Sequence, residues 1–527
     1  MFNELLAQQF PRILTQACRD VHSPFYGCFD RNWWHYRIRD FSSIMLQQGG
    51  YFAFQYSKLL GFEVHKEQLR ELAKASAIFW NHRAGKKGAF EEYYPWEQGY
   101  PPLAFSSLAM AKLVAQDVVF VDEIETGLRK AAKQLQERFE YQAGNQQVAG
   151  LAALGVIRKI FPELVDEDKY IQIKQKTLAL QNAEGWYTEY DGPDLGYLSV
   201  TLDCLFDLYD FTGDHDYLES AEKGMDFLHD MITRFQGSTG MHNARNTDYI
   251  VPYGIFRFLE HEDEVYSKKA TEIVAIIYEN LDSKTHFFRA VDDRYWIHYI
   301  GHSIARAQLL MNRLKTPKFG RNKYQPTDRI YEKSGYIFRT LPESETRILV
   351  SGKKGGIFTL FNKEKQLVSN FGWIARDGNK VFVNHWWAND WKFAADDKKI
   401  HIEGFLYPHK EKISKPVLHM GLRIVSLLFG SRLTGMLRNV LIFKSKSSTI
   451  AFERKIDLAG EEVIVTDIID NIEKKVQLRR APRASRRHVA SADSWHQEDF
   501  ILLEIEEPSE MIIRKDKKAV ITTTYKI

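Results

Sequence analysis

The residues best suited to chemistry lie in one polar and aromatic segment, residues 184–197. Its candidate site residues are Glu189, Tyr190, Asp194 and Tyr197. Carboxyl groups can exchange protons and bind sugar hydroxyls, and a phenol near positive charge can accept a proton. The segment runs directly into an apolar stretch, so we expect a loop at the entry to a helix, where ligand-binding groups commonly lie. The alternative is a loop whose acids only cap backbone N–H groups.

Two further polar segments could supply the groups that bind an acidic ligand. Asn145 and Gln146 open a long apolar run, so they can either cap a helix or offer amide N–H donors to a sugar carboxylate. His242 and Arg245 lie in the Gly- and Asn-rich segment 240–249. An arginine can bind a carboxylate through two parallel hydrogen bonds, although a local salt bridge with Asp248 is equally compatible with the sequence.

Aromatic residues near histidines and acids form the remaining candidates. His385 is followed directly by Trp386 within the segment 383–391, and we consider it either as a general acid or base or as a packed core imidazole. Trp96 lies in the acidic and aromatic segment 91–97. Both tryptophans are of the type that stacks against sugars, and both are also common in protein cores.

The elements that must position these residues differ between the two halves of the chain. Up to about residue 325, apolar residues recur at spacings of three and four, as in Ile124, Leu128, Ala131 and Leu135. This is the period of an amphipathic helix. Many helices joined by turn-rich loops, without alternating strands, predict an all-α layer, and the helix–loop–helix rhythm suits helical hairpins arranged in a ring.

After about residue 330 the pattern becomes that of short strands separated by Gly, Asn, Asp and Lys. Val463, Val465 and Ile469 alternate with polar residues at a period of two. This pattern predicts an antiparallel β-sandwich. The expected domains are therefore residues 1–325 and 330–527, joined by a polar, basic linker. The predicted strands are 356–361, 366–374, 380–387, 399–407, 439–443, 448–452, 462–469 and 519–525.

Composition narrows the class of protein. The 527 residues carry 72 Lys and Arg against 69 Asp and Glu, a formal charge of +3, so we expect no nucleic-acid partner bound through bulk charge. Three cysteines imply no disulfide framework, and no secretory signal is visible at the N-terminus, so we expect a cytoplasmic protein. The apolar stretch 417–430 is too short to span a bilayer, and it predicts a buried or interfacial helix that could touch a membrane or a partner.

Several common sites are missing from the sequence. No Gly-rich phosphate loop, His-Glu-x-x-His helix, Cys-x-x-Cys pair or Gly-x-Ser-x-Gly elbow is present. We therefore expect neither a metal nor another cofactor, and we leave the oligomeric state open.

Taken together, these features resemble the heparinase II/III-like polysaccharide lyases. Gly144-Asn145-Gln146 is similar to the family's helical Asn motif, and Tyr197 matches the catalytic Tyr by its placement before a helix. The segment 334–339 is similar to the family's first β-segment, and Asn384-His385 falls in the region of its His motif. The resemblance implies an α+β multidomain protein with an N-terminal incomplete α/α toroid and a C-terminal antiparallel β-sandwich.

The resemblance also implies a reaction, which is β-elimination at a uronic acid of an acidic oligo- or polysaccharide. Tyr197 would accept the C5 proton, Asn145 and Arg245 would neutralise the carboxylate, and His385 or His242 would share the proton transfer. Glycoside hydrolysis by a pair of carboxyls, such as Glu189 with Asp194 or Glu184 with Asp191, is an alternative. A uronosyl C5-epimerase and a non-catalytic glycan-binding or assembly protein are the others. The residues assigned to substrate binding are Gln146, Arg245, Glu189, Tyr190, Asp194, Trp96 and Trp386.

Overall fold

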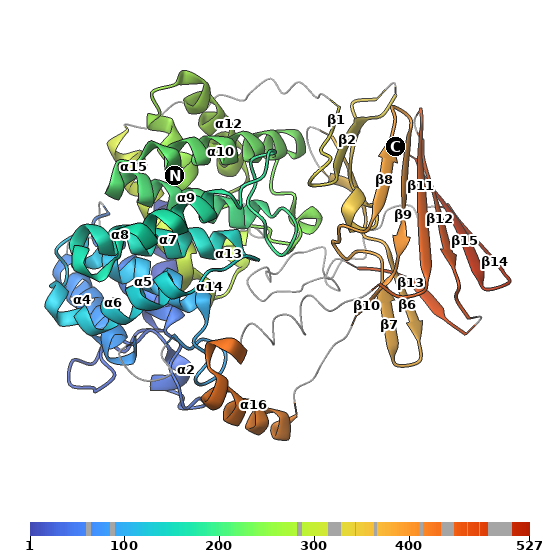
Figure 1. Cartoon of the computed structure of the whole chain (residues 1–527). Coiled ribbons are helices and arrows are strands. Elements are labelled where there is room, and N and C mark those ends of the chain that lie inside the picture. The colour runs from blue at the N-terminus through green and yellow to red at the C-terminus, as the bar shows by residue number, and fades with distance from the viewer. Residues whose placement is uncertain are drawn as a thin grey trace.

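The computed structural model describes most of the chain. The described residues are 1–59, 65–84, 90–281, 287–314, 328–342, 344–362, 366–409, 415–433, 447–460, 462–473, 475–482 and 509–526. The predicted strand 439–443 and most of the predicted linker lie outside these residues. Figure 1 shows a helical half, which holds the N-terminus, beside a half built of strands, which holds the C-terminus.

The helical half is an α/α toroid, as predicted. Six of its helices form an inner ring, because α3, α5, α7, α9, α11 and α15 each contact the next and α15 contacts α3. The others, such as α4 and α10, pack outside this ring. The helices are α1 (Asn3–Leu14), α2 (Arg31–Trp34), α3 (Gln48–Tyr56), α4 (Lys66–Ala84), α5 (Tyr100–Ala115), α6 (Val121–Glu137), α7 (Gly144–Ile160), α8 (Glu167–Leu178), α9 (Leu195–Thr212), α10 (His215–Phe235), α11 (Tyr253–Arg257), α12 (Glu264–Asn280), α13 (Phe287–Ala290), α14 (Asp293–Tyr295), the π-helical turn η6 (Trp296–Ile300) and α15 (Gly301–Arg313).

The position of each helix follows from its apolar pattern. Helix α6 buries Ile124, Leu128, Ala131 and Leu135 on one face, so it covers the ring from outside. Helices α7 and α9 are buried on nearly every side, as expected for helices that are apolar all round. The beginning of α9 is fixed by Asp194, whose carboxylate accepts a hydrogen bond from the backbone N–H of Tyr197 at 3.2 Å.

The second half folds into three antiparallel sheets that share one core. Their strand orders are β1-β2-β3-β4-β5, β10-β7-β6-β13 and β14-β15-β12-β11-β9-β8. The strands are β1 (Arg329–Ile330), β2 (Tyr336–Thr340), β3 (Arg347–Ser351), β4 (Ile357–Phe361), β5 (Gln366–Asn370), β6 (Trp373–Asp377), β7 (Lys380–Val383), β8 (Lys392–Ala395), β9 (Lys399–Phe405), β10 (Tyr407–His409), β11 (Ala451–Ala459), β12 (Glu462–Asp470), β13 (Gln477–Arg480), β14 (Ser509–Lys515) and β15 (Lys518–Lys526). The predicted fold class, a toroid followed by an antiparallel β-sandwich, is therefore confirmed.

Several strand predictions were wrong in detail: 380–387 runs past the end of β7, 448–452 covers only the start of β11, and 399–407 reaches from β9 into β10 of another sheet. The run 366–374 forms two strands, β5 and β6, in two different sheets. The chain turns between them at Gly372, whose φ of +91° favours glycine, and a Cβ there would lie 2.0 Å from Oδ1 of Asn384. The apolar pattern continues through the corner, which is why the sequence suggested one strand.

The five-stranded sheet joins the two halves of the molecule. Its residues alternate between two cores: Ile337 packs with the sandwich, whereas Tyr336 and Phe338 belong to the apolar core of the helical half. Leu349 and Phe361 on the neighbouring strands also pack into the helical core. The outer face of this sheet therefore covers one side of the toroid (Figure 1).

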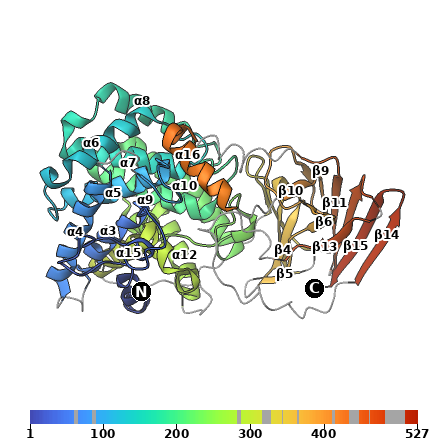
Figure 2. The ribbon, with the colours of Figure 1, turned by 90° about the horizontal axis from the view of Figure 1, so that it is seen from below.

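The predicted helix at 417–430 is present as α16 (Pro416–Phe429), between β10 and β11, and it is not buried, which was one of the two alternatives that the sequence left open. Ser426 is its only buried residue, and the helix lies on the outside of the helical half (Figures 1 and 2). Within the part of the chain that the structure describes, no helix is long and apolar enough to cross a membrane.

Candidate functional site

Most candidate residues of the helical half gather where the inner helices α7 and α9 begin, and Trp96 and His242 lie elsewhere. The loop before α9 and the first turn of α7 pair through an antiparallel bridge between Ala143 and Glu189. The loop 240–249 joins them, since the backbone N–H of Arg245 donates to Asp194 at 3.1 Å. Segments from 144 to 249 in the sequence therefore meet at one mouth of the ring.

Glu189 is the central acid of this cluster. Its carboxylate accepts the backbone N–H of Asn145 at 2.7 Å, while its second oxygen, Oε2, is buried and has no hydrogen-bond partner among the described residues. Burial raises the pKa of Glu189 well above its ordinary value, and nearby carboxylates add to this effect. This shift favours the protonated form of Glu189, which can donate a hydrogen bond.

The two amides at the beginning of α7 also present atoms without partners. Oδ1 of Asn145 and Oε1 of Gln146 are buried, and neither has a hydrogen-bond partner in the described part of the chain. Neither side chain therefore acts as the cap that the sequence left open, and the residue preceding the helix, Ala143, caps nothing through its side chain. Buried polar atoms without partners are rare in proteins and often mark a place that a ligand fills.

Asp194, in contrast, is fully engaged by the protein. Besides the N–H groups of Tyr197 and Arg245, its carboxylate accepts hydrogen bonds from the backbone and hydroxyl of Thr247. Burial raises the pKa of Asp194 to about 6, although these hydrogen bonds act in the opposite direction and lower it. The sequence left open whether the acids of this loop bind a ligand or cap backbone N–H groups. In the structure, Asp194 caps backbone N–H groups. Asp194 positions Tyr197 and Arg245 by holding both of their N–H groups.

Arg245 and Tyr190 form a stacked pair beside Glu189. The guanidinium carbon of Arg245 lies 4.4 Å from the centre of the Tyr190 ring, and its Nε is buried without a hydrogen-bond partner among the described residues. Tyr190 and Asp191 have φ values of 55° and 76°, and Asn246 has 62°. Non-glycine residues in this left-handed region are strained, and such strain is concentrated at functional sites.

Tyr197 begins a row of phenols that extends into the ring. Its side chain is 8% exposed, and its ring meets that of Tyr249 edge-on with centroids 6.3 Å apart. The hydroxyl of Tyr249 lies 2.7 Å from that of Tyr299. Burial raises the pKa of both Tyr249 and Tyr299, so these two phenols stay protonated. Tyr197 and Tyr299 stand at the two ends of this row, and Tyr249 lies between them.

Tyr299 and its neighbour His298 were not predicted from the sequence. They lie in η6, where His298 has a non-helical ψ of −148°. Nε2 of His298 is buried without a partner among the described residues, and burial, helped by Arg294, lowers the pKa of this imidazole well below its ordinary value. The aromatic run 295–299 is the signal that could have indicated them.

The β-half reaches the same cluster through Trp387. A Cβ on Gly192 would lie 2.6 Å from Cε2 of Trp387 and 2.7 Å from Cβ of Ala244, so glycine is required where the three segments meet. Nε1 of Trp387 is buried without a partner in the described residues. The predicted stacking residue, Trp386, instead lies against Tyr407 of β10, with ring centroids 6.3 Å apart. Of the two neighbouring tryptophans, Trp387 is therefore the one that contacts the segments of the cluster, and the stacking of Trp386 against a sugar stays a prediction.

The two histidines assigned to proton transfer are both buried. His385 is 0% exposed at the end of β7, which corresponds to the packed imidazole that the sequence left open. His242 is 1% exposed and lies between the halves, with Nδ1 2.7 Å from the Ser351 hydroxyl and Nε2 2.9 Å from that of Thr359. Since both of its nitrogens are engaged by strands β3 and β4, the expectation that His242 transfers protons does not fit this geometry.

Trp96 lies apart from this cluster, in the loop between α4 and α5. Its φ is 61°, and its backbone N–H donates to Glu91 at 2.7 Å. The same loop reaches the mouth of the ring through Glu92, which is 3.4 Å from Arg294, just before η6. Trp96 is therefore on a loop that borders the site, without a described contact to Glu189 or Arg245.

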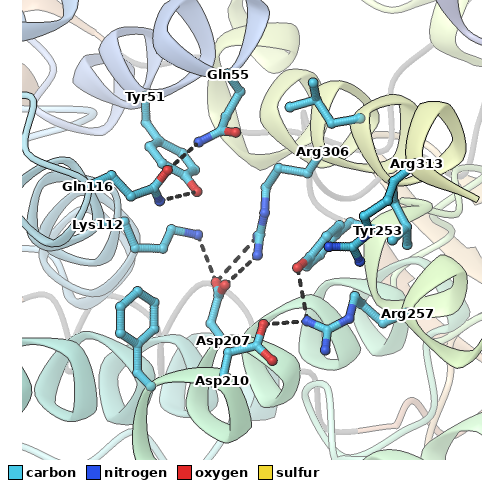
Figure 3. Close-up of a pocket in the computed structure, with 13 residues that line it drawn as sticks. Tyr51, Gln55, Lys112, Gln116, Asp207, Asp210, Tyr253, Arg257, Arg306 and Arg313 are labelled. Atoms are coloured by element: carbon cyan, nitrogen blue, oxygen red, sulfur yellow. Dashed lines mark hydrogen bonds and ion pairs between the residues drawn. The ribbon is translucent and has the colours of Figure 1, made fainter. Parts of the chain in front are cut away.

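A pocket of about 460 Å³ opens at the other end of the inner helices (Figure 3). Tyr197 and Asp207 lie on α9 ten residues apart, which corresponds to about 15 Å along a helix. Lys112 and Arg306 both point at Asp207, and Arg257 contacts Asp210 (Figure 3). Arg313 pairs with Glu260. Each cation of this pocket therefore has a carboxylate partner, and the network is that of a structural ion cluster.

Among the residues whose placement is described, no group of three or more His, Cys, Asp or Glu side chains could hold a metal ion.

Comparisons with known proteins give only remote likenesses. No family model and no curated protein matches the chain. Among solved structures, the chain is similar to chondroitin AC lyase from Streptomyces coelicolor A3, at 10% identity and a TM-score of 0.45, covering 89% of this chain and 66% of that one. It is also similar to heparinase III, at 10% identity and a TM-score of 0.41, covering 100% of this chain and 87% of that one.

A family 76 glycoside hydrolase from a Bacteroides thetaiotaomicron strain is a further similar structure. Its identity is 12% and its TM-score 0.36, covering 59% of this chain and 77% of that one. At such identities and TM-scores, we derive neither substrate nor activity from these likenesses.

Proposed function

We propose that the protein is a glycan-processing enzyme of the polysaccharide lyase type, which cleaves a uronic-acid-containing chain by β-elimination. The observation that carries this proposal is the set of buried polar atoms without partners at one mouth of the ring. Asn145, Gln146, Glu189 and Arg245 contribute one such atom each, from three segments of the chain. Groups of this kind are costly to bury unless a ligand completes their hydrogen bonds.

These groups suit a sugar carboxylate. Arg245 adds a positive charge, and a protonated Glu189 and the NH2 groups of Asn145 and Gln146 can donate to the carboxylate. The unpartnered amide oxygens of Asn145 and Gln146 only accept, so they suit the hydroxyl groups of the sugar. A carboxylate bound in this way has its charge neutralised, which makes the neighbouring C5–H bond more acidic. The asparagine and arginine predicted for this task are thus held near one another by Glu189 and Asp194.

Tyr197 is the proposed base. Its backbone N–H and that of Arg245 bond to the same carboxylate of Asp194, which fixes the two residues in one frame. In the reaction, the Tyr197 phenolate takes the C5 proton, the electron pair forms the C4–C5 double bond, and the bond from C4 to the leaving oxygen breaks. The phenol then returns its proton to that oxygen.

The engagement of the acids argues against hydrolysis. A hydrolase needs two carboxyls that face the scissile bond. Asp194 is occupied by four hydrogen bonds from the protein. Glu184 accepts the backbone N–H groups of Lys333 and Ser334, at 2.7 and 3.0 Å, and the indole N–H of Trp186. Each pair considered from the sequence therefore has one member committed to the fold.

We further propose that the reaction takes place in the cytoplasm. The three cysteines, Cys18, Cys28 and Cys204, are buried free thiols, and this supports a reducing compartment.

The test is an assay of the purified protein on a panel of uronic-acid polymers and oligosaccharides. A lyase gives one unsaturated, ultraviolet-absorbing end per cleavage, a hydrolase gives a new reducing end without that absorbance, and an epimerase exchanges C5 hydrogen in heavy water without cleavage. An unsaturated product that Tyr197→Phe no longer forms supports the proposal. New reducing ends without unsaturation would contradict it, as would a wild-type protein that binds these glycans and turns over none of them.

A further inference from the structure

Helix α16 presents an extended apolar surface to the outside. Its exposed apolar side chains include Val417 at 77%, Leu428 at 72% and Met420 at 66% exposure. Leu418, Ile424, Val425, Leu427 and Phe429 are also exposed. Monomeric soluble proteins rarely expose contiguous apolar patches of this kind unless something binds to them.

The polar side of α16 faces the rest of the protein. His419, Arg423 and Ser426 follow one another at spacings of four and three, so they form a single stripe along the helix. Arg423 pairs with Asp40, with Nη2 3.1 Å from Oδ1, and the Ser426 hydroxyl donates to the carbonyl oxygen of Pro95 at 2.9 Å. These polar contacts hold the helix against the helical half.

This orientation is the reverse of that of an ordinary surface helix, which turns its apolar stripe inward and its charges to water. The apolar residues of α16 extend around the remaining circumference and point away from the toroid. Figure 2, which views the molecule from below, shows α16 lying across the front of the helical half. The fold thus displays its most apolar helix on an outer face.

The charge of the sequence that precedes and follows α16 indicates what covers this face. Residues 410–446 contain eight Lys and Arg and a single acid, Glu411, in a chain whose total charge is only +3. Lys415 and Arg432 flank the helix and are exposed. An apolar helix with basic flanks is the pattern of a segment that lies in the interface of an anionic membrane, where lipid tails receive the apolar side chains and headgroups attract the cations.

We propose that α16 is an interfacial helix that binds the protein to the surface of an anionic lipid bilayer. Its 14 residues span about 21 Å, too short to cross the hydrocarbon core, so the helix lies flat. Ser426 contacts Pro95, which lies in the same loop as Glu92, and Glu92 pairs with Arg294 just before η6. The inference stands apart from the lyase proposal, since it rests on α16 alone.

The experiment is co-sedimentation of the full chain with vesicles of phosphatidylcholine, with and without added phosphatidylglycerol. We expect binding to the anionic vesicles that weakens as salt is raised. The triple variant Leu418→Ser, Ile424→Ser, Leu428→Ser removes three exposed apolar side chains and should abolish binding. The matched control replaces Met511, Ile512 and Ile513 of the exposed strand β14 with Ser and should bind as the wild type does.

A second variant isolates the electrostatic part. Lys415→Gln with Arg432→Gln removes two exposed cations, and at about 1 kcal/mol for each cation near an anionic surface, affinity should fall about 30-fold. Failure of the wild type to bind anionic vesicles, or unchanged binding by the Leu418, Ile424, Leu428 variant, would overturn the proposal. So would sedimentation velocity showing a dimer that this variant abolishes, without any vesicle binding, because the occupant would then be a second copy of the chain.

Discussion

The carboxylate of Glu189 bonds to the backbone N–H of Asn145 at 2.7 Å and thereby fixes the loop before α9 against the first turn of α7. The replacement Glu189→Gln keeps an acceptor for this N–H and keeps a neutral donor, so we expect KM for a uronic-acid glycan to stay within about threefold of the wild type. Glu189→Ala removes both and should raise KM at least about tenfold by the loss of one charge-assisted hydrogen bond. Steady-state kinetics of the two variants test this difference in KM. Equal KM values for Glu189→Gln and Glu189→Ala would contradict the assigned function of Glu189.

Replacing Tyr197 tests the proposed base. Tyr197→Phe removes only a hydroxyl, so we expect kcat to fall by about 10²–10⁴-fold while glycan binding persists. The control is Tyr217→Phe, which removes a buried hydroxyl 2.9 Å from that of Tyr170 on the outer helices. The control should lower the melting temperature slightly and leave kcat unchanged. Equal losses of kcat in both variants would indicate a general effect of packing.

His242 should act on stability and not on chemistry. Its ring joins the loop before Asn243 to the hydroxyls of Ser351 and Thr359, so His242→Ala leaves these buried hydroxyls without that partner. We expect a loss of about 2–4 kcal/mol in the free energy of unfolding. At a temperature where the variant is folded, kcat should remain within a few-fold of wild type. A loss of kcat comparable to that of Tyr197→Phe would restore His242 as a proton-transfer residue.

The ion cluster at the far end of the ring predicts a large stability effect. Lys112 is 1% exposed and Arg306 9%, and both contact Asp207, which is 3% exposed. Burial alone raises the pKa of Asp207, but the two cations bring it below its ordinary value. Asp207→Asn leaves two buried cations without their shared carboxylate, so the free energy of unfolding in urea should fall by about 3–5 kcal/mol. Asp210→Asn, at the more exposed pair with Arg257, should cost about 1 kcal/mol or less.

Glu97 predicts a pH dependence of stability. Burial, together with the charge of Glu92, raises its pKa to about 7 from an ordinary 4.5. Between these values the folded state binds a proton that the unfolded state has released, so stability falls as pH rises through this window. Glu97→Gln removes the titrating group and, with it, this fall in stability with pH. The stability of the variant relative to wild type should therefore increase by roughly 3 kcal/mol from pH 4.5 to pH 7. A flat difference in thermal melts across this range would contradict the prediction.

The architecture could be predicted because it is set by local periodicity. The spacing of Ile124, Leu128, Ala131 and Leu135 is a property of one short segment, and so is the alternation of Val463 and Val465. The points where the chain passes from one sheet to another were harder to predict. Gly372 divides an apolar run into strands of two sheets, and the reason, its close approach to Asn384, is visible only in the tertiary structure.

The site was harder to predict because residue type does not determine a residue's surroundings. Asp194 and Glu189 are both acids of one loop, yet the first is used by backbone N–H groups and the second keeps a free oxygen. His242 looked available until strands more than a hundred residues later supplied its partners. Likewise, the sequence left open whether the helix at 417–430 is buried or interfacial, and only the tertiary structure reveals that its polar stripe is the side that is covered.

The shared sheet has a consequence for how the molecule can be divided. Tyr336, Phe338, Leu349 and Phe361 complete the core of the toroid from strands that belong to the other half. A gene fragment that ends before β1 would leave the toroid without these side chains, and a fragment that begins there would expose them to water. We expect both fragments to be insoluble when expressed separately, and the intact chain to show a single calorimetric transition. In evolution, the helical half could therefore be combined with a different β-half only if that β-half also supplied the apolar side chains that complete the core of the toroid.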